Sequence, residues 1–230
     1  MNNLFEQTEM GNQSTYNEFL SKVFLNICVG LVITFAVASV CYMTGNVFLS
    51  VAHPFAVIIA QLGLAWLFTY SLYRMPKAVM YVCYVLYSAL LGVTFSILPL
   101  LYDGTSITFA IGLTAVIFAC MAFIGHNTHI DLSRYSTYMV IGLISIIAIT
   151  LLNIFFIHSG GLDLLLTYVG VLLFLAITAW DVQRLRAMYL QSYSDSELSS
   201  KIVLYGAFQL YLDFVNLFIR ILQIFGRRKN

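Results

Sequence analysis

The feature that most constrains this chain is a long apolar stretch without charge, since Val23 to Tyr73 contains no Asp, Glu, Lys or Arg. The residues from Ala78 to Tyr102 are again free of these four residue types. Only 9% of the 230 residues are charged, whereas soluble domains average about a quarter. Runs of this length and composition are typical of membrane spans. The sequence therefore predicts an integral membrane protein and excludes a water-soluble globule.

Seven apolar segments emerge when these runs are divided at polar or turn-forming residues. A helix rises 1.5 Å per residue, so about 20 apolar residues cross the hydrocarbon core. The segments lack the period-two alternation of barrel strands, and helices are therefore predicted. The predicted spans are Val23–Met43, Pro54–Tyr73, Ala78–Leu98, Ile107–Ile124, Tyr138–Ile157, Leu164–Leu185 and Ile202–Phe225.

These segments predict an all-α membrane protein, a seven-transmembrane-helix bundle whose C-terminal helix is central. The sequence shows no internal repeat and no linker that would mark a second domain. We predict a polar cytoplasmic N-terminal tail over residues 1–21, a single transmembrane domain over residues 22–226 and a short basic tail over residues 227–230.

The positions of Lys and Arg predict the sidedness, because cytoplasmic loops carry the excess of these residues. The three loops on the side opposite the N-terminus hold none. The basic tail would then lie outside if the last segment crosses fully, which Ile202–Phe225 can do at about 36 Å. We favour that crossing over a re-entrant segment and predict a cytoplasmic N-terminus. The charges on the N-terminal side are Lys22, Arg74, Lys77, Arg134, Arg184, Arg186 and Lys201.

A stripe of polar residues follows one face of the last segment, at spacings of four, three, four and three. Such a stripe indicates a helix that faces a bundle interior or a pore. The alternative is that these side chains only hydrogen-bond helices together, as polar residues in membrane bundles often do. The stripe consists of Gln209, Asp213, Asn216, Arg220 and Gln223.

Two acids, Asp181 and Asp213, fall inside the predicted sixth and seventh spans. An acid within a membrane helix costs a few kcal/mol on insertion scales, so it is retained mainly where it faces other helices or a watery cavity. The sixth helix runs towards the cytoplasm and the seventh runs back, so the two acids are expected at similar depth. Two neighbouring carboxyl groups in a poorly solvated site cannot both ionise cheaply, and the pair is predicted to share a proton.

This pair would act as a pH-sensitive latch, and a neighbouring guanidinium could lock one of its acids. Arg74, at the cytoplasmic end of the second helix, is a better candidate than Arg220, which lies about 10 Å along the axis from Asp213. Calcium usually takes six to eight oxygen ligands, more than two carboxylates supply. We therefore predict only weak, transient calcium binding at Asp181 and Asp213.

At these residues the sequence resembles the Bax inhibitor-1, or transmembrane Bax inhibitor motif, family and particularly its bacterial branch. The strongest match is LYLDFVNLF at residues 210–218, followed by IFG at residues 224–226. A second match is TAWDVQR at residues 178–184, where the family commonly has Tyr before the Asp. The number, order and spacing of the apolar segments also agree, so the likeness covers nearly the whole chain.

The resemblance implies a multi-pass protein of the bacterial inner membrane that forms a pH-sensitive calcium leak. Asp181 and Asp213 would be the sensor pair, and Arg74 would latch it in the closed state. Calcium would then be the transported ion, and the protein would be surrounded by the lipid bilayer. No cofactor is expected. The chain departs from some relatives in having no acid in Pro54–Tyr73. The polar pathway would comprise Thr178, Gln209, Asn216 and Arg220.

Other functions stay open at this point. Some bacterial relatives look like modulators of a membrane-bound ATP-dependent protease, with the tail Met1–Ser21 as a recognition handle. Proton-coupled transport would use Asp213 as the carrier site. An intramembrane aspartyl protease would carry its two acids in Tyr-Asp and Gly-x-Gly-Asp motifs, whereas Asp181 follows Trp180 and Asp213 follows Tyr211-Leu212, so we predict no enzyme. A net charge of +1 without a clustered basic face argues against nucleic-acid binding.

Overall fold

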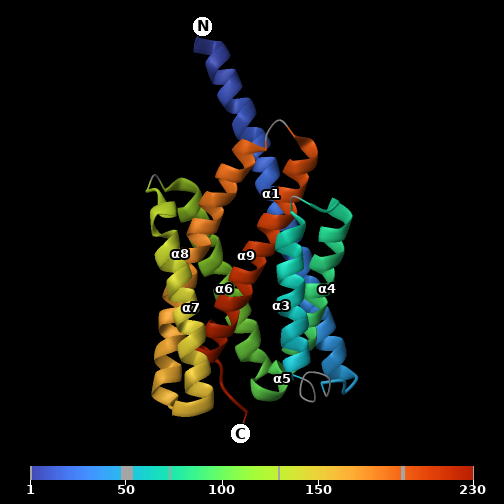
Figure 1. The fold of residues 1–230 in the computed structure, drawn as a ribbon, viewed down its shortest axis with the longest axis vertical. Coiled ribbons are helices and arrows are strands. Elements are labelled where there is room, and N and C mark those ends of the chain that lie inside the picture. Colours follow the sequence, from blue (N-terminus) through green and yellow to red (C-terminus); the bar gives the residue numbers. More distant parts are fainter. Residues whose placement is uncertain (1, 48–53, 73, 129, 193–194, 230) are drawn as a thin grey trace. The chain divides into compact units, whose positions relative to one another are not determined.

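The protein is helical over almost all of its length in the computed structural model, which describes residues 2–47, 54–72, 74–128, 130–192 and 195–229 (Figure 1). Within these residues β-pairing is limited to one isolated bridge, between Tyr102 and Arg228. The elements are α1 (Asn2–Met43), α3 (Pro54–Ser71), α4 (Lys77–Phe95), α5 (Leu98–Leu101), α6 (Gly104–Asn127), η1 (Leu132–Tyr135), α7 (Ser136–Leu152), η2 (Asn153–Ile157), α8 (Gly160–Gln191) and α9 (Ser196–Phe225).

Each predicted apolar segment coincides with a helix, which confirms the all-α membrane fold. Among the described residues, six helical stretches are long and apolar enough to cross a membrane, and a seventh, Phe55–Tyr70, is shorter. Several helices continue into polar sequence at their ends, and α1 begins at Asn2, within the predicted tail. The six stretches are Tyr16–Met43, Lys77–Leu101, Gly104–Asn127, Leu132–Ile157, Gly160–Gln191 and Glu197–Phe225.

The last of these stretches is the most buried. In its most apolar window 78% of the residues are buried, against 39% or less in each of the other five. This burial agrees with the prediction that the C-terminal helix is central. It also explains the composition of α9, because a helix without lipid contact can carry polar side chains that a lipid-facing helix would expose to hydrocarbon.

The chain forms two compact units. Unit 1 comprises Met1–Ile97 and Ala187–Gln209, and unit 2 comprises Leu98–Arg186 and Leu210–Asn230. The last residues of α8 and the first part of α9 therefore belong to unit 1, and the second part of α9 belongs to unit 2. The single membrane domain over residues 22–226 stays a prediction.

In unit 1, α4 packs alongside both α1 and α3 (Figure 1). The Thr34 hydroxyl donates a hydrogen bond to the Ser88 carbonyl oxygen at 3.0 Å, and joins α1 to α4. Between these helices the Tyr84 hydroxyl also donates to the carbonyl oxygen of Asn26, at 2.7 Å. These bonds use backbone oxygens that already belong to helices, so they add interhelical contacts without breaking either helix.

In unit 2, α9 runs antiparallel to α6. The ring of Phe118, midway along α6, lies 5.6 Å from that of Phe214, and the ring of Phe109, near the start of α6, lies 6.2 Å from that of Phe225. The basic tail continues this arrangement, since the backbone N–H of Lys229 donates to the carbonyl oxygen of Leu101 at 3.0 Å. The tail thus lies beside the end of α5, just before α6 begins. The full crossing of the membrane by the last segment stays a prediction.

Candidate functional site

The two predicted acids meet inside unit 2. Asp181 comes from α8 and is 9% exposed, and Asp213 comes from α9 and is 4% exposed. Their carboxyl groups lie within hydrogen-bonding reach of each other. Ionised carboxylate oxygens only accept hydrogen bonds, so a bond between these two groups needs a proton on one of them. Two carboxyl groups this close can share a proton.

One oxygen of the pair is short of partners. Asp213 Oδ2 is buried and accepts no hydrogen bond from any residue that the structure describes. A buried carboxylate oxygen without a donor is costly when it carries charge. The surroundings of Asp213 therefore favour a neutral carboxyl group or an approaching proton or cation over a bare negative charge.

Close packing of α6 on α8 fixes the backbone next to Asp181. A side chain at Gly125 would overlap the carbonyl group of Ala179, two residues before Asp181. Only glycine lets the end of α6 approach α8 this closely, because a Cβ atom at this position would force the two helices apart. Gly125 thereby fixes the position of the α8 backbone two residues before Asp181.

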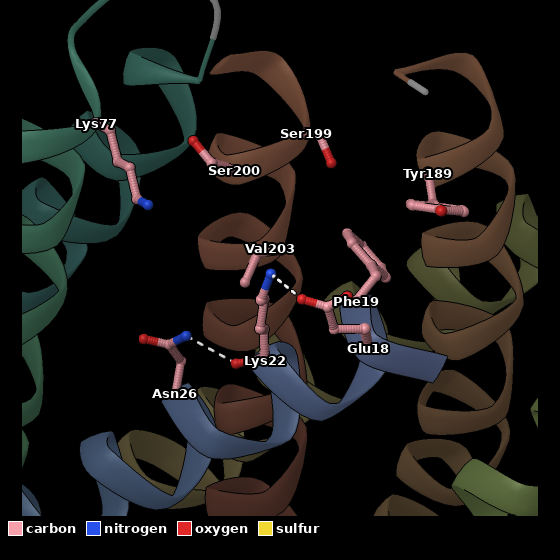
Figure 2. A pocket seen from close by; sticks show the side chains of 9 residues that line it. All are labelled: Glu18, Phe19, Lys22, Asn26, Lys77, Tyr189, Ser199, Ser200 and Val203. Atoms are coloured by element: carbon pink, nitrogen blue, oxygen red, sulfur yellow. Dashed lines mark hydrogen bonds and ion pairs between the residues drawn. The ribbon is translucent and has the colours of Figure 1, made fainter. Parts of the chain in front are cut away.

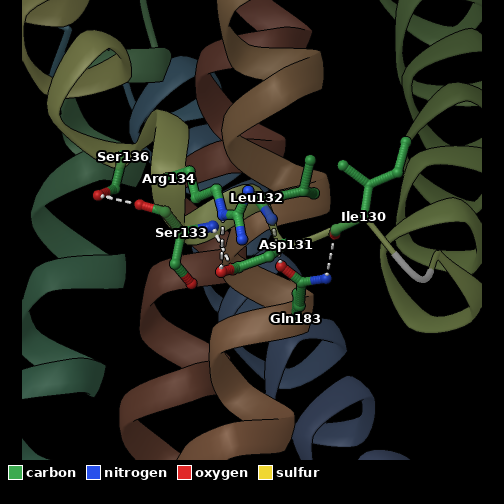
Figure 3. A network of polar contacts seen from close by, with 7 residues as sticks. All are labelled: Ile130, Asp131, Leu132, Ser133, Arg134, Ser136 and Gln183. Carbon is green, nitrogen blue, oxygen red and sulfur yellow. Dashed lines mark hydrogen bonds and ion pairs between the residues drawn. The ribbon is translucent and has the colours of Figure 1, made fainter.

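On the other side of Asp181, Gln183 clamps the loop between α6 and α7 (Figure 3). Its Oε1 accepts a hydrogen bond from the backbone N–H of Leu132 at 2.8 Å, and its Nε2 donates to the carbonyl oxygen of Ile130 at 2.8 Å. The loop has its own support, because Asp131 Oδ1 accepts a hydrogen bond from the Ser133 N–H at 3.0 Å. These hydrogen bonds attach the loop to α8 two residues after Asp181.

The positive charge that acts on Asp181 within unit 2 is Arg184, one helical turn further along α8. Its guanidinium lies 5.4 Å from the centroid of the Trp180 ring. Reasoning from sequence missed this residue, although the spacing of three places it on the same side of the helix as Asp181. The guanidinium of Arg184 thus supplies a positive charge on the same side of α8 as Asp181.

The remaining polar residues of the predicted pathway bond mainly to their own helices. Thr178 Oγ1 donates to the carbonyl oxygen of Phe174 at 2.7 Å, and Asn216 Nδ2 donates to that of Leu212 at 2.8 Å. In unit 1, Gln209 Nε2 donates to the hydroxyl of Tyr205 at 3.4 Å. Among these polar residues, Asp213 differs in that it interacts with a second acid, Asp181 of α8.

Arg220 joins α9 to α8 at the other end of the stripe. Its Nη1 donates to the carbonyl oxygen of Leu166 at 3.1 Å, and its guanidinium lies 5.5 Å from the centroid of the Phe174 ring. The guanidinium fills the space beside Gly170, where a side chain would overlap it. The neighbouring Gln223 accepts a hydrogen bond from Thr167 at 3.3 Å. This end of the stripe binds helices together.

Arg74 lies in unit 1, between α3 and α4, and is exposed. Its Nη1 donates to the hydroxyl of Tyr70 at 2.6 Å, and its guanidinium lies 4.8 Å from the centroid of that ring. The predicted partners Asp181 and Asp213 belong to unit 2. The latching role of Arg74 stays a prediction.

The pair and its surroundings lie within a region that matches a known family. The sequence pattern of the family described as "Inhibitor of apoptosis-promoting Bax1" matches residues 16–230. The chain belongs to the Bax inhibitor-1 family. The resemblance inferred from the motifs around Asp181 and Asp213 is thereby confirmed, over almost the whole chain.

Relatives of similar length occur in distant bacteria. The chain is 36% identical over 221 residues to an uncharacterised protein of Borreliella burgdorferi, covering 93% of this chain and 94% of the relative. It is 34% identical over 221 residues to "Inner membrane protein YbhL" of Escherichia coli K12, covering 92% of each. A protein of Deinococcus radiodurans is 30% identical over 227 residues, 97% of each chain. These matches, with the apolar helices, identify a multi-pass membrane protein of this family.

Proposed function

We propose that this protein is a pH-sensitive calcium leak channel of the bacterial inner membrane, with Asp181 and Asp213 as its sensor. The observation that carries the proposal is the direct approach of two buried carboxyl groups on membrane helices of unit 2. Membership in the Bax inhibitor-1 family supports the same function. The name of the E. coli relative supports the inner membrane as the location.

The pair supplies the pH dependence. With one proton shared, it carries a single negative charge that a guanidinium can hold, and we assign this latching role to Arg74. A second proton removes that charge and weakens the latch, so the channel opens as the pH falls. Calcium passes by weak contact with the carboxylate oxygens, since two carboxylates are too few to store it.

The test is calcium flux into liposomes that contain the purified protein, measured from about pH 5 to pH 8, the range that a buried carboxyl pair can reach. We expect the flux of the parent protein to rise as the pH falls. Asp181→Asn and Asp213→Asn should each flatten this dependence, because neither variant can share a proton between two acids. Asp163→Asn makes the same chemical change at the start of α8 and should keep the pH dependence of the parent.

Arg74→Gln tests the latch separately. Without the guanidinium the closed state loses its lock, so this variant should show a high flux at neutral pH as well as at acidic pH. No flux above that of empty liposomes at any pH would reject the channel. Saturable uptake of a solute driven by a proton gradient would point instead to a transporter with Asp213 as its carrier site.

A further inference from the structure

A pocket of about 470 Å³ opens in unit 1, whereas the acid pair belongs to unit 2 (Figure 2). It is formed where α1 enters its apolar stretch, where α4 begins, where α8 ends and where α9 begins. The sequence predicts that all four of these places lie at the cytoplasmic membrane surface. The pocket is lined by Glu18, Phe19, Lys22, Asn26, Lys77, Tyr189, Ser199, Ser200 and Val203.

The charges of the pocket leave it positive. Lys22 Nζ forms an ion pair with Glu18 Oε1 at 2.8 Å, which offsets one lysine. Lys77 forms no ion pair with any residue in the described part of the chain, and its amino group points into the pocket in Figure 2. An ammonium group held above a cavity without a counter-charge provides a site for an anion.

Neutral hydrogen-bond donors surround the lysines. The amide nitrogen of Asn26 uses one N–H on the carbonyl oxygen of Lys22, at 2.7 Å, and keeps a second. The hydroxyl of Ser199 makes no hydrogen bond to the residues that the structure describes. Several donors of this kind around one cationic group suit the oxygens of a phosphate, which can accept bonds from several directions.

Other side chains that line the pocket are apolar or aromatic. The rings of Phe19 and Tyr189 lie 4.6 Å apart, centroid to centroid, and Val203 adds an aliphatic surface. A pocket that combines cationic and apolar side chains, at the end of membrane helices, matches a group that lies between water and hydrocarbon. Phospholipid headgroups occupy that depth, and the cytoplasmic leaflet carries the anionic ones.

We propose that this pocket binds a phosphate-bearing anion, and that its position at the membrane surface favours the headgroup of an anionic phospholipid. Lys77 is the main electrostatic contact, Lys22 assists it, and Glu18 weakens binding by holding Lys22 and repelling the anion. This site is independent of the calcium leak, since none of its lining residues belongs to the acid pair.

The experiment measures lipid binding to the purified full chain in detergent by native mass spectrometry. Phosphatidylglycerol is compared with phosphatidylcholine of the same acyl chains. Lys77→Gln should weaken phosphatidylglycerol binding about fivefold, the effect of one lysine near a membrane surface, and Glu18→Gln should strengthen it by a similar factor. Lys201→Gln is the matched control, because Lys201 lies on α9 outside the pocket lining and pairs with Glu197 at 2.8 Å.

A soluble competitor distinguishes the two sources of phosphate. If glycerol 3-phosphate displaces phosphatidylglycerol from the parent but not from Lys77→Gln, a soluble phosphate compound also fits the site. If it displaces nothing while Lys77→Gln still weakens lipid binding, the occupant is the lipid. The proposal is overturned if phosphatidylglycerol and phosphatidylcholine bind equally to the parent, or if Lys77→Gln and Lys201→Gln have the same effect. Size-exclusion elution identical to that of the parent checks that each variant is folded.

Discussion

The two parts of α9 have opposite surroundings. The part in unit 1 carries Phe208, whose ring lies 4.2 Å from that of Phe68 and 5.0 Å from that of Tyr87, so this interior is filled by aromatic side chains. The part in unit 2 carries two ionisable side chains, the buried Asp213 and the half-buried Arg220. Aromatic packing stabilises a membrane helix directly, whereas an interior charge costs free energy. This difference supports the proposal that the part of α9 in unit 2 is the one that responds to pH.

The largest loss of stability is expected from Phe208→Ala. The side chain is 1% exposed, and its removal leaves a cavity among aromatic rings, which should lower the free energy of unfolding by about 4 kcal/mol. Phe156→Ala, at a residue that is 77% exposed, is the control and should change stability little. Unfolding of the reconstituted protein by denaturant measures both. Equal losses would contradict the assignment of Phe208 to a packed interior.

The next largest effect is expected from Gly125→Val. The new side chain would overlap the carbonyl group of Ala179 and push α6 from α8, at a cost of about 3 kcal/mol from overpacking. Because Asp181 lies two residues after Ala179 on α8, the pH dependence of calcium flux should shift as well. Gly112→Val lies on the same helix with no atom within 4 Å of the new Cβ, and should preserve both properties. Normal stability and normal pH dependence in Gly125→Val would contradict the role of Gly125 in the close packing of α6 on α8.

A smaller effect is expected from Arg220→Met. The substitution removes the hydrogen bond to the Leu166 carbonyl oxygen and the contact with the Phe174 ring, together about 1.5 kcal/mol of stability. The pH at which calcium flux changes should stay that of the parent, since Arg220 lies about 10 Å along the helix from Asp213. Flux and unfolding measured on the same preparation separate these effects. A shifted pH response with normal stability would make Arg220 part of the sensor instead.

The sequence predicts the helices well because each one leaves a local signal. Apolar runs of about 20 residues, interrupted by polar residues, predicted α4 and α6 within a few residues at each end. They also predicted the ends of α1 and α9 at Met43 and Phe225, but both helices begin earlier, in polar sequence that carries no apolar signal. The contact between Asp181 and Asp213 was also predictable, since acids on two consecutive membrane helices are expected to face the bundle interior rather than lipid. The family motif added to this expectation without changing it.

The contacts that position the acid pair could not be predicted in the same way. Gly125 is one of 14 glycines in the chain, and only the path of α8 shows that it faces the backbone of Ala179. The clamp of Gln183 on the loop at Ile130 and Leu132 depends on a loop conformation that sequence periodicity does not encode. Arg184 had a usable signal, namely its spacing of three from Asp181, which sequence reasoning overlooked.

The most direct test of the central claim is infrared spectroscopy of the protonated carboxyl groups of the reconstituted protein during a pH titration. A shared proton predicts a carboxyl band in the parent whose pH of disappearance changes in Asp181→Asn and in Asp213→Asn, while Asp163→Asn leaves it unchanged. If the titrations of Asp181 and Asp213 are independent, each single variant will only remove its own signal and leave the other at the same pH. That result would contradict a proton shared between the two acids.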